Sequence, residues 1–180
     1  TTRIKDGYEQ ILSAFSNHEA DILIGTQMIV KGHDFPGVTL VGVLAADLSL
    51  YISDYRASER TFQLLTQAAG RAGRGDIPGN VIIQTYDPDH YSITTAKEQN
   101  YEAFYGQEIE YRKMMRYPPV WNMLYILCAS KNEAAASEAA VALMGKIDQI
   151  VRENSEKIFS IGPSDAPVAK ISDVYRKVIY

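Results

Sequence analysis

The 180-residue chain contains a single cysteine, Cys128, and no long apolar run. One cysteine excludes an internal disulfide and a cysteine-rich zinc site formed by this chain alone, and it fits a reducing compartment. The longest nearly apolar segment, residues 38–46, is far shorter than the ~20 residues that span a membrane. No basic segment followed by an apolar stretch opens the chain, so we do not expect secretion. These absences favour a cytoplasmic protein without a membrane segment.

The sequence also lacks an excess of positive charge. Residues 1–100 carry 8 basic and 12 acidic side chains and residues 101–180 carry 10 of each, so the net charge is −4. Neither half has the strongly basic character of domains that bind nucleic acid over a broad surface. Any DNA contact should therefore be local, or shared with another part of a longer protein. The chain begins with Thr1 and ends in an apolar stretch at Tyr180, which leads us to expect a fragment.

Helical patterns and short apolar strands alternate in the first part of the chain. Apolar residues at helical spacing predict an amphipathic helix over residues 5–16. Three short apolar runs predict buried strands, at residues 22–24, 40–44 and 81–83. Between the last two, Ser53 or Asp54 can cap a helix that carries Phe62 and Leu65 on one side. Alternating strands and helices predict a parallel sheet covered by helices.

The second part of the chain follows a different order. A helical pattern over residues 90–116 ends at two consecutive prolines. We then predict a strand at 123–130, a helix from Asn132 to about Arg152, a strand at 157–161 and another from about Val168. This order suits a small α+β sandwich. The predicted fold class is thus α/β, with a parallel-sheet domain at residues 1–117 and a small α+β domain at residues 118–180.

One of two segments with clustered polar groups is residues 25–36, GTQMIVKGHDFP. It follows the predicted strand at 22–24, and ligands of open α/β sheets bind beyond the carboxyl ends of strands. Its candidate ligand-binding residues are Thr26, Gln27, Lys31, Gly32 and Asp34. A polar loop whose glycines only shape turns would explain the segment equally well.

The other segment is residues 67–75, QAAGRAGRG. Its candidate residues are Gln67, Gly70, Arg71, Gly73 and Arg74. At ~100° per residue, a helix would place the amide and both guanidinium groups on one narrow stripe, beside two glycines that leave the stripe uncovered. Neighbouring arginines suit a triphosphate, because guanidinium binds phosphate oxygens through paired hydrogen bonds and keeps its charge. The alternative is an ordinary helix end at Gly73 or Gly75.

These motifs resemble those of a known family. The pattern from Gln67 to Arg74 resembles the sixth conserved motif of superfamily 2 helicases, and the segment around Thr26 resembles their fifth. The longer strings GTQMIVKGHDFP, VTLVGVLAAD, DYRASERTFQLLTQAAGRAGRG, NVIIQTYDPDH and RYPP resemble the bacterial primosomal replication-restart helicases. The resemblance covers nearly the whole chain.

The resemblance implies a RecA-like second helicase lobe and a C-terminal domain of an ATP-driven 3′→5′ DNA translocase that acts at stalled or abandoned replication forks. It implies catalytic roles for Gln67, Arg71 and Arg74, nucleotide contacts for Gly32, Asp34, Gly70 and Gly73, and DNA contacts for Thr26, Gln27 and Lys31. Expected partners are forked and single-stranded DNA, primosome proteins and single-strand-binding proteins. We expect the parent protein to be monomeric.

Motifs that would complete an ATPase site are missing from this chain. It has neither a G-x-x-x-x-G-K-[ST] phosphate loop nor an acidic Mg²⁺-binding motif, both of which the resemblance places on a first lobe. An eight-cysteine zinc segment, placed upstream by the resemblance, is missing as well. We therefore expect ATP and Mg²⁺ to be shared with a first lobe, zinc to bind only in the full-length protein, and the chain alone to be inactive. Another superfamily 2 translocase and a non-catalytic interaction module are the alternatives.

Overall fold

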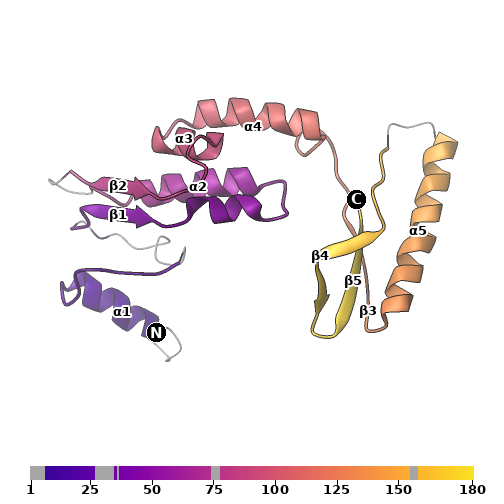
Figure 1. Ribbon diagram of the computed structural model, residues 1–180, viewed down its shortest axis with the longest axis horizontal. Coiled ribbons are helices and arrows are strands. Elements are labelled where there is room, and N and C mark those ends of the chain that lie inside the picture. Colours follow the sequence, from indigo (N-terminus) through magenta and orange to yellow (C-terminus); the bar gives the residue numbers. More distant parts are fainter. Residues whose placement is uncertain (1–6, 27–34, 36, 74–77, 155–157) are drawn as a thin grey trace. The chain divides into compact units, whose positions relative to one another are not determined.

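The computed structural model describes residues 7–26, 35, 37–73, 78–154 and 158–180. The chain forms two compact units, Thr1–Ile109 and Glu110–Tyr180, which divide inside helix α4 (Tyr101–Met115). The first unit contains a parallel sheet and the second an antiparallel sheet, so the predicted fold class is confirmed (Figure 1). The predicted domain limits, 1–117 and 118–180, stay a prediction. Among the described residues, no helix combines the length and apolar character needed to cross a membrane.

The parallel sheet of the first unit consists of β1 (Leu40–Val43) and β2 (Asn80–Ile83). The chain connects them through the 3₁₀ helix η2 (Ala46–Tyr51) and the α-helix α2 (Ala57–Ala69), which contacts β1 and η2. Both strands lie where the sequence predicts strands, and their register pairs Leu40 with Asn80 and Val43 with Ile83. The order strand, helix, parallel strand is the crossover unit of α/β proteins.

The core of the first unit lies between α2 and the two helices that follow β2. Its buried residues are Ala46, Phe62, Leu65, Ile93, Ala96 and Phe104. The rings of Phe62 and Phe104 stack with their centroids 4.3 Å apart. This contact joins α2 to α4, and it shows why the predicted apolar side of α2 is buried.

The prediction of a buried strand at residues 22–24 is wrong. Ile22 and Ile24 are 77% and 88% exposed, and the segment is not in a strand. A strand needs a neighbouring backbone that satisfies its N–H and C=O groups. Among the described residues, β1 and β2 form a two-stranded sheet without this segment. Helix α1 (Gly7–Ser16) precedes it, and Phe15 packs edge-on against Phe35, with 5.0 Å between the ring centroids.

The helical pattern at 90–116 forms two helices, α3 (Tyr91–Lys97) and α4. Gln99 interrupts them with a left-handed backbone, φ 50°. Asn100 then starts α4, because its Oδ1 accepts a hydrogen bond from the N–H of Ala103 at 2.9 Å.

The second unit contains β3 (Ile126–Ser130), α5 (Glu133–Asn154), β4 (Ser164–Ile171) and β5 (Val174–Ile179). The sheet order is β3-β5-β4 with antiparallel pairs, and α5 packs on β3 and β5. The elements follow the predicted order of one strand, a helix and two strands, but the last two strands lie later in the chain than predicted. The predicted Asn132 cap is confirmed, since its Oδ1 accepts from the N–H of Ala135 at 3.2 Å.

The predicted strand at residues 157–161 is wrong over its described part, 158–161. Ile161 does exchange two backbone hydrogen bonds of 3.0 Å with Tyr180, but regular pairing begins only at Ser164. Gly162 separates the two segments with φ 128°, a conformation outside the range of a regular strand. The short apolar run therefore pairs locally without forming a strand of its own.

Candidate functional site: the turn after helix α2

Helix α2 ends at Ala69, before both arginines of the 67–75 segment. Gly70 closes the helix with its N–H bonded to the carbonyl of Thr66 at 3.0 Å. The N–H of Arg71 then bonds to the carbonyl of Ala68, also at 3.0 Å, which is the tighter spacing of a 3₁₀ turn. The prediction of one helical stripe is therefore wrong, because Gly70 and Gly73 have low helix propensity and end the helix early. The alternative placed the helix end at Gly73 or Gly75, whereas α2 ends earlier, at Ala69.

The turn still brings together four of the five predicted residues of this segment. Gln67 is exposed in the last turn of α2, Gly70 is exposed at its end, and Arg71 is half-buried in the turn itself. Gly73 ends the turn with φ 72°, in the left-handed region that favours glycine. Arg74 lies outside the described residues. An amide and a guanidinium thus lie four residues apart, beside a glycine backbone without a covering side chain.

The 25–36 segment contributes less to the described structure. Thr26 is exposed. The other predicted residues, Gln27, Lys31, Gly32 and Asp34, lie outside the described residues. The expectation that this segment follows a carboxyl strand end is wrong, since 22–24 is not a strand.

Backbone hydrogen bonds place the turn at the amino ends of the two parallel strands. The N–H of Gly73 donates to the carbonyl of Val38, just before β1, at 3.1 Å. The N–H of Asn80, at the start of β2, donates to the carbonyl of Thr39 at 2.8 Å. The end of α2 and the starts of β1 and β2 therefore meet, and the sheet fixes the position of the turn.

A buried carboxylate, which the sequence analysis did not identify, lies at the opposite end of the sheet. Asp47 is 2% exposed, and its Oδ1 accepts a hydrogen bond from the N–H of Tyr86 at 3.2 Å. Beside it, the N–H of Ala46 donates to the carbonyl of Gln84 at 2.9 Å. Asp47 thus joins the segments that follow β1 and β2, as a buried carboxylate must find partners. The only sequence signal was an acidic residue directly after the apolar run at residues 38–46.

Two arginines share one carboxylate at the start of α2. Asp54 accepts hydrogen bonds from Nε and Nη2 of Arg56, each at 3.1 Å, and Nη1 of Arg60 lies 2.8 Å from its Oδ2. These hydrogen bonds from Arg56 lower the pKa of Asp54. Asp54 is not the N-cap of α2, because it accepts the N–H of Arg56 at 2.9 Å before the helix begins. This cluster lies at the start of α2, and the candidate site follows the other end of the same helix.

A family model matches part of the first unit. Residues 4–76 match the helicase conserved C-terminal domain, and the match spans β1, α2 and the Gln67–Gly73 turn.

Individual relatives extend the match to the second unit. The chain is 49% identical over 177 residues to replication restart protein PriA of Bacillus subtilis. It is 43% identical over 176 residues to that of Synechocystis and 41% identical over 177 residues to that of Chlamydia pneumoniae. Each alignment covers 98% of this chain but only 21–23% of the relative, so the chain spans about a fifth of their length. The resemblance to the replication-restart helicases is confirmed, and it extends over nearly the whole chain.

Proposed function

We propose that this chain acts as the second lobe and following domain of an ATP-dependent 3′→5′ DNA helicase that restarts replication at stalled forks in the cytoplasm. The observation that carries the proposal is the glycine- and arginine-containing turn after α2, which lies inside the helicase match at residues 4–76. The high identity to replication restart proteins supports the same function for both units. Forked and single-stranded DNA, primosome proteins and single-strand-binding proteins are the proposed partners of a monomeric parent protein.

The chemistry of the turn suits a triphosphate. Phosphoryl transfer spreads negative charge over the γ-phosphoryl oxygens, and a fixed arginine stabilises that charge. Arg71 and Arg74 would supply this stabilisation, while the amide of Gln67 would orient an oxygen or the attacking water. Gly70 is exposed and would let a phosphate approach its backbone, while Gly73 would lie near the nucleotide and shape the turn. ATP and Mg²⁺ would be held mainly by a first lobe, since this chain has no phosphate loop.

The remaining proposed site residues belong to the 25–36 segment. Thr26, which is exposed, would contact the DNA backbone together with Gln27 and Lys31. Gly32 and Asp34 would lie near the nucleotide. Motion along DNA would then follow from the closure of the two lobes on ATP and their opening after hydrolysis.

Replacement of the arginines tests the proposal. In the full-length protein, Arg71→Ala and Arg74→Ala should each lower DNA-stimulated ATP turnover by about 10³-fold. The KM for ATP and the affinity for DNA should change little, because the arginines act mainly in the transition state. Lysine should not restore turnover, since an ammonium cannot form paired hydrogen bonds.

A matched control is Arg152→Ala, which removes an exposed arginine from the last turn of α5. It should leave turnover unchanged. Near-normal ATPase activity in both the Arg71 and Arg74 variants would contradict the proposed function and favour a non-catalytic interaction module.

A further inference from the structure

Two glycines from different segments approach each other at the candidate site. A Cβ atom on Gly73 would lie 2.5 Å from the backbone nitrogen of Gly79. A Cβ atom on Gly79 would lie 2.7 Å from the Cβ of Ala72, and still closer to the nitrogen of Gly73 and the carbonyl carbon of Ala72. Real Cβ atoms do not make contacts this short. Gly79 therefore lets the backbone before β2 lie directly against the turn that carries Arg71.

Backbone hydrogen bonds on both sides fix the turn that Gly79 contacts, including one of 3.3 Å from the N–H of Ala72 to the carbonyl of Ala69. On the helix side, the N–H groups of Gly70 and Arg71 donate to the carbonyls of Thr66 and Ala68, each at 3.0 Å. On the sheet side, the N–H of Gly73 donates to the carbonyl of Val38 at 3.1 Å. A side chain at position 79 would push Ala72 and Gly73 away from β2, while the helix side stays attached to α2. The displacement would thus fall on residues 71–73.

We propose that Gly79 is a positioning residue for the arginine-containing half of the ATPase site. It touches no substrate in this role; it fixes the backbone at Ala72 and Gly73 and thereby the direction of the Arg71 side chain. Electrostatic stabilisation of a transition state requires groups that are already in place before reaction. The inference rests on the proposed function, and it adds a residue outside the 67–75 motif.

The kinetic test is Gly79→Ala in the full-length protein. A misplacement of about 1 Å at a catalytic group can lower turnover by about 100-fold, and we expect a loss of this order. The KM for ATP should change less than the turnover, and the thermal midpoint should stay close to that of the control. The matched control is Gly42→Ala in β1, where an added Cβ meets nothing within 4 Å. It should turn over ATP at the normal rate.

Hydrogen exchange tests the geometry of the turn, first in the unmodified chain and then in the variant. In the unmodified chain, the Gly73 amide should exchange more slowly than in an unstructured peptide, because it is bonded to Val38. In Gly79→Ala this protection should be lost, while the amides of α2 keep theirs. An unprotected Gly73 amide in the unmodified chain would overturn the inference even if the variant failed to fold.

The outcomes separate this inference from the proposed function. If Arg71→Ala and Arg74→Ala abolish turnover but Gly79→Ala does not, the positioning role is wrong and the proposed function stands. If turnover in Gly79→Ala falls only in proportion to the loss of folded protein, the glycine is merely structural and the inference is again overturned. If the arginine variants are fully active, the proposed function itself fails.

Discussion

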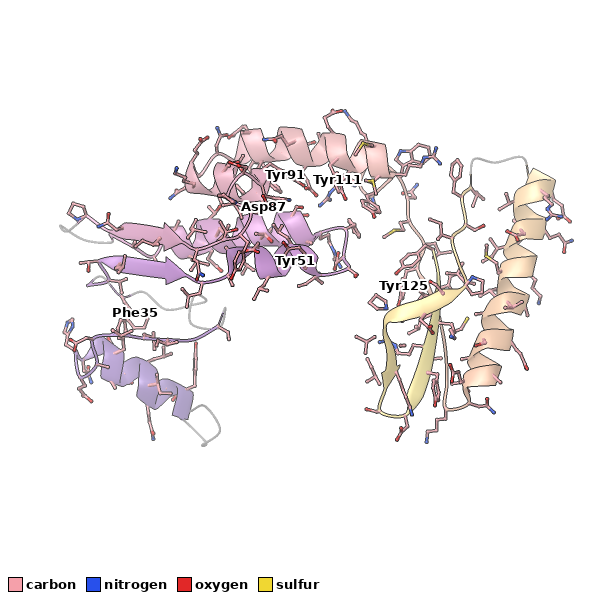
Figure 2. The ribbon with its side chains drawn as sticks, in the orientation of Figure 1. Phe35, Tyr51, Asp87, Tyr91, Tyr111 and Tyr125 are labelled. Carbon is pink, nitrogen blue, oxygen red and sulfur yellow. The ribbon has the colours of Figure 1, made fainter. Side chains whose placement is uncertain are left out.

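His90 illustrates how a single side chain acquires its role from its position. It precedes α3, and its Nδ1 accepts a hydrogen bond from the N–H of Ser92 at 3.2 Å. Its ring stacks on Tyr91, with 4.6 Å between the centroids, and Figure 2 shows Tyr91 and Asp87 near the start of this helix. Burial lowers the pKa of His90, while the nearby carboxylates of Asp87 and Glu108 partly oppose that shift. Sequence alone gave no reason to choose this histidine, because its partners depend on the local turn.

The stability of the chain should therefore depend on the protonation of His90. Because the pKa of His90 is lowered in the folded state, the unfolded chain takes up the proton first as the pH falls. The free energy of unfolding should thus fall as the pH drops through about 6.5, the ordinary pKa of histidine, and continue to fall until the folded-state pKa is reached. Protonation also removes the acceptor that caps α3.

His90→Asn is the comparison for this prediction, since asparagine can cap the helix but does not titrate. Urea denaturation at several pH values should show a smaller loss of stability in His90→Asn than in the unmodified chain. Identical pH profiles for the two proteins would show that His90 does not contribute. His18 and His33 are present in both proteins, so their effects cancel.

At the scale of helices and strands, the sequence predicts an element well where its pattern is long or its cap is local. Helix α5 follows from its run of alanines and from Asn132, whose cap lies three residues from its partner. The failures at 22–24 and 158–161 are short apolar runs, and whether such a run becomes a strand depends on a distant neighbour. Helix α2 ends at Ala69 because the glycines that follow have low helix propensity, and the predicted stripe required the helix to continue beyond them. Asp47 could not be predicted either, because its partner Tyr86 is 39 residues away.

Glycine substitutions should have opposite effects in different elements. Gly106 lies inside α4, where an added Cβ meets nothing within 4 Å. Gly106→Ala should raise the free energy of unfolding by about 0.5–1 kcal/mol, because alanine loses less backbone entropy on folding. Gly162 has φ 128°, and a Cβ there would lie 2.8 Å from the carbonyl oxygen of Val178.

Gly162→Ala should therefore destabilise the chain by more than ~1 kcal/mol, since alanine cannot adopt that backbone without strain. Chemical denaturation of both variants and the unmodified chain would measure the two effects. Stabilisation by Gly162→Ala would show that its backbone conformation is not as described. A loss of stability in Gly106→Ala would show that this surface of α4 is not open.

At the scale of the whole molecule, the fold class follows from the order of the elements, whereas the proposed ATPase site would need groups that this sequence lacks. The parallel sheet of the first unit and the α+β character of the second were predicted from the sequence, whereas the antiparallel pairing was not. Under the proposed function, the candidate site would be half of an ATPase site: its motif residues are recognisable, but a phosphate loop is missing from the sequence. The turn after α2 is bonded to Val38 through Gly73 and lies against Gly79, and both of these residues are outside the 67–75 segment.

The isolated 180-residue chain should not hydrolyse ATP and should bind DNA weakly. Arginines that stabilise a transition state cannot act without groups that bind the phosphates and Mg²⁺, and this sequence lacks the motif for them. Its net charge of −4 opposes the phosphate contacts that dominate DNA affinity. The measurement is ATP turnover and DNA binding at low and moderate salt, with the full-length protein as the positive control. Robust DNA-stimulated hydrolysis by the chain alone would show that it carries a complete ATPase site, and the division of the site between two lobes would be wrong.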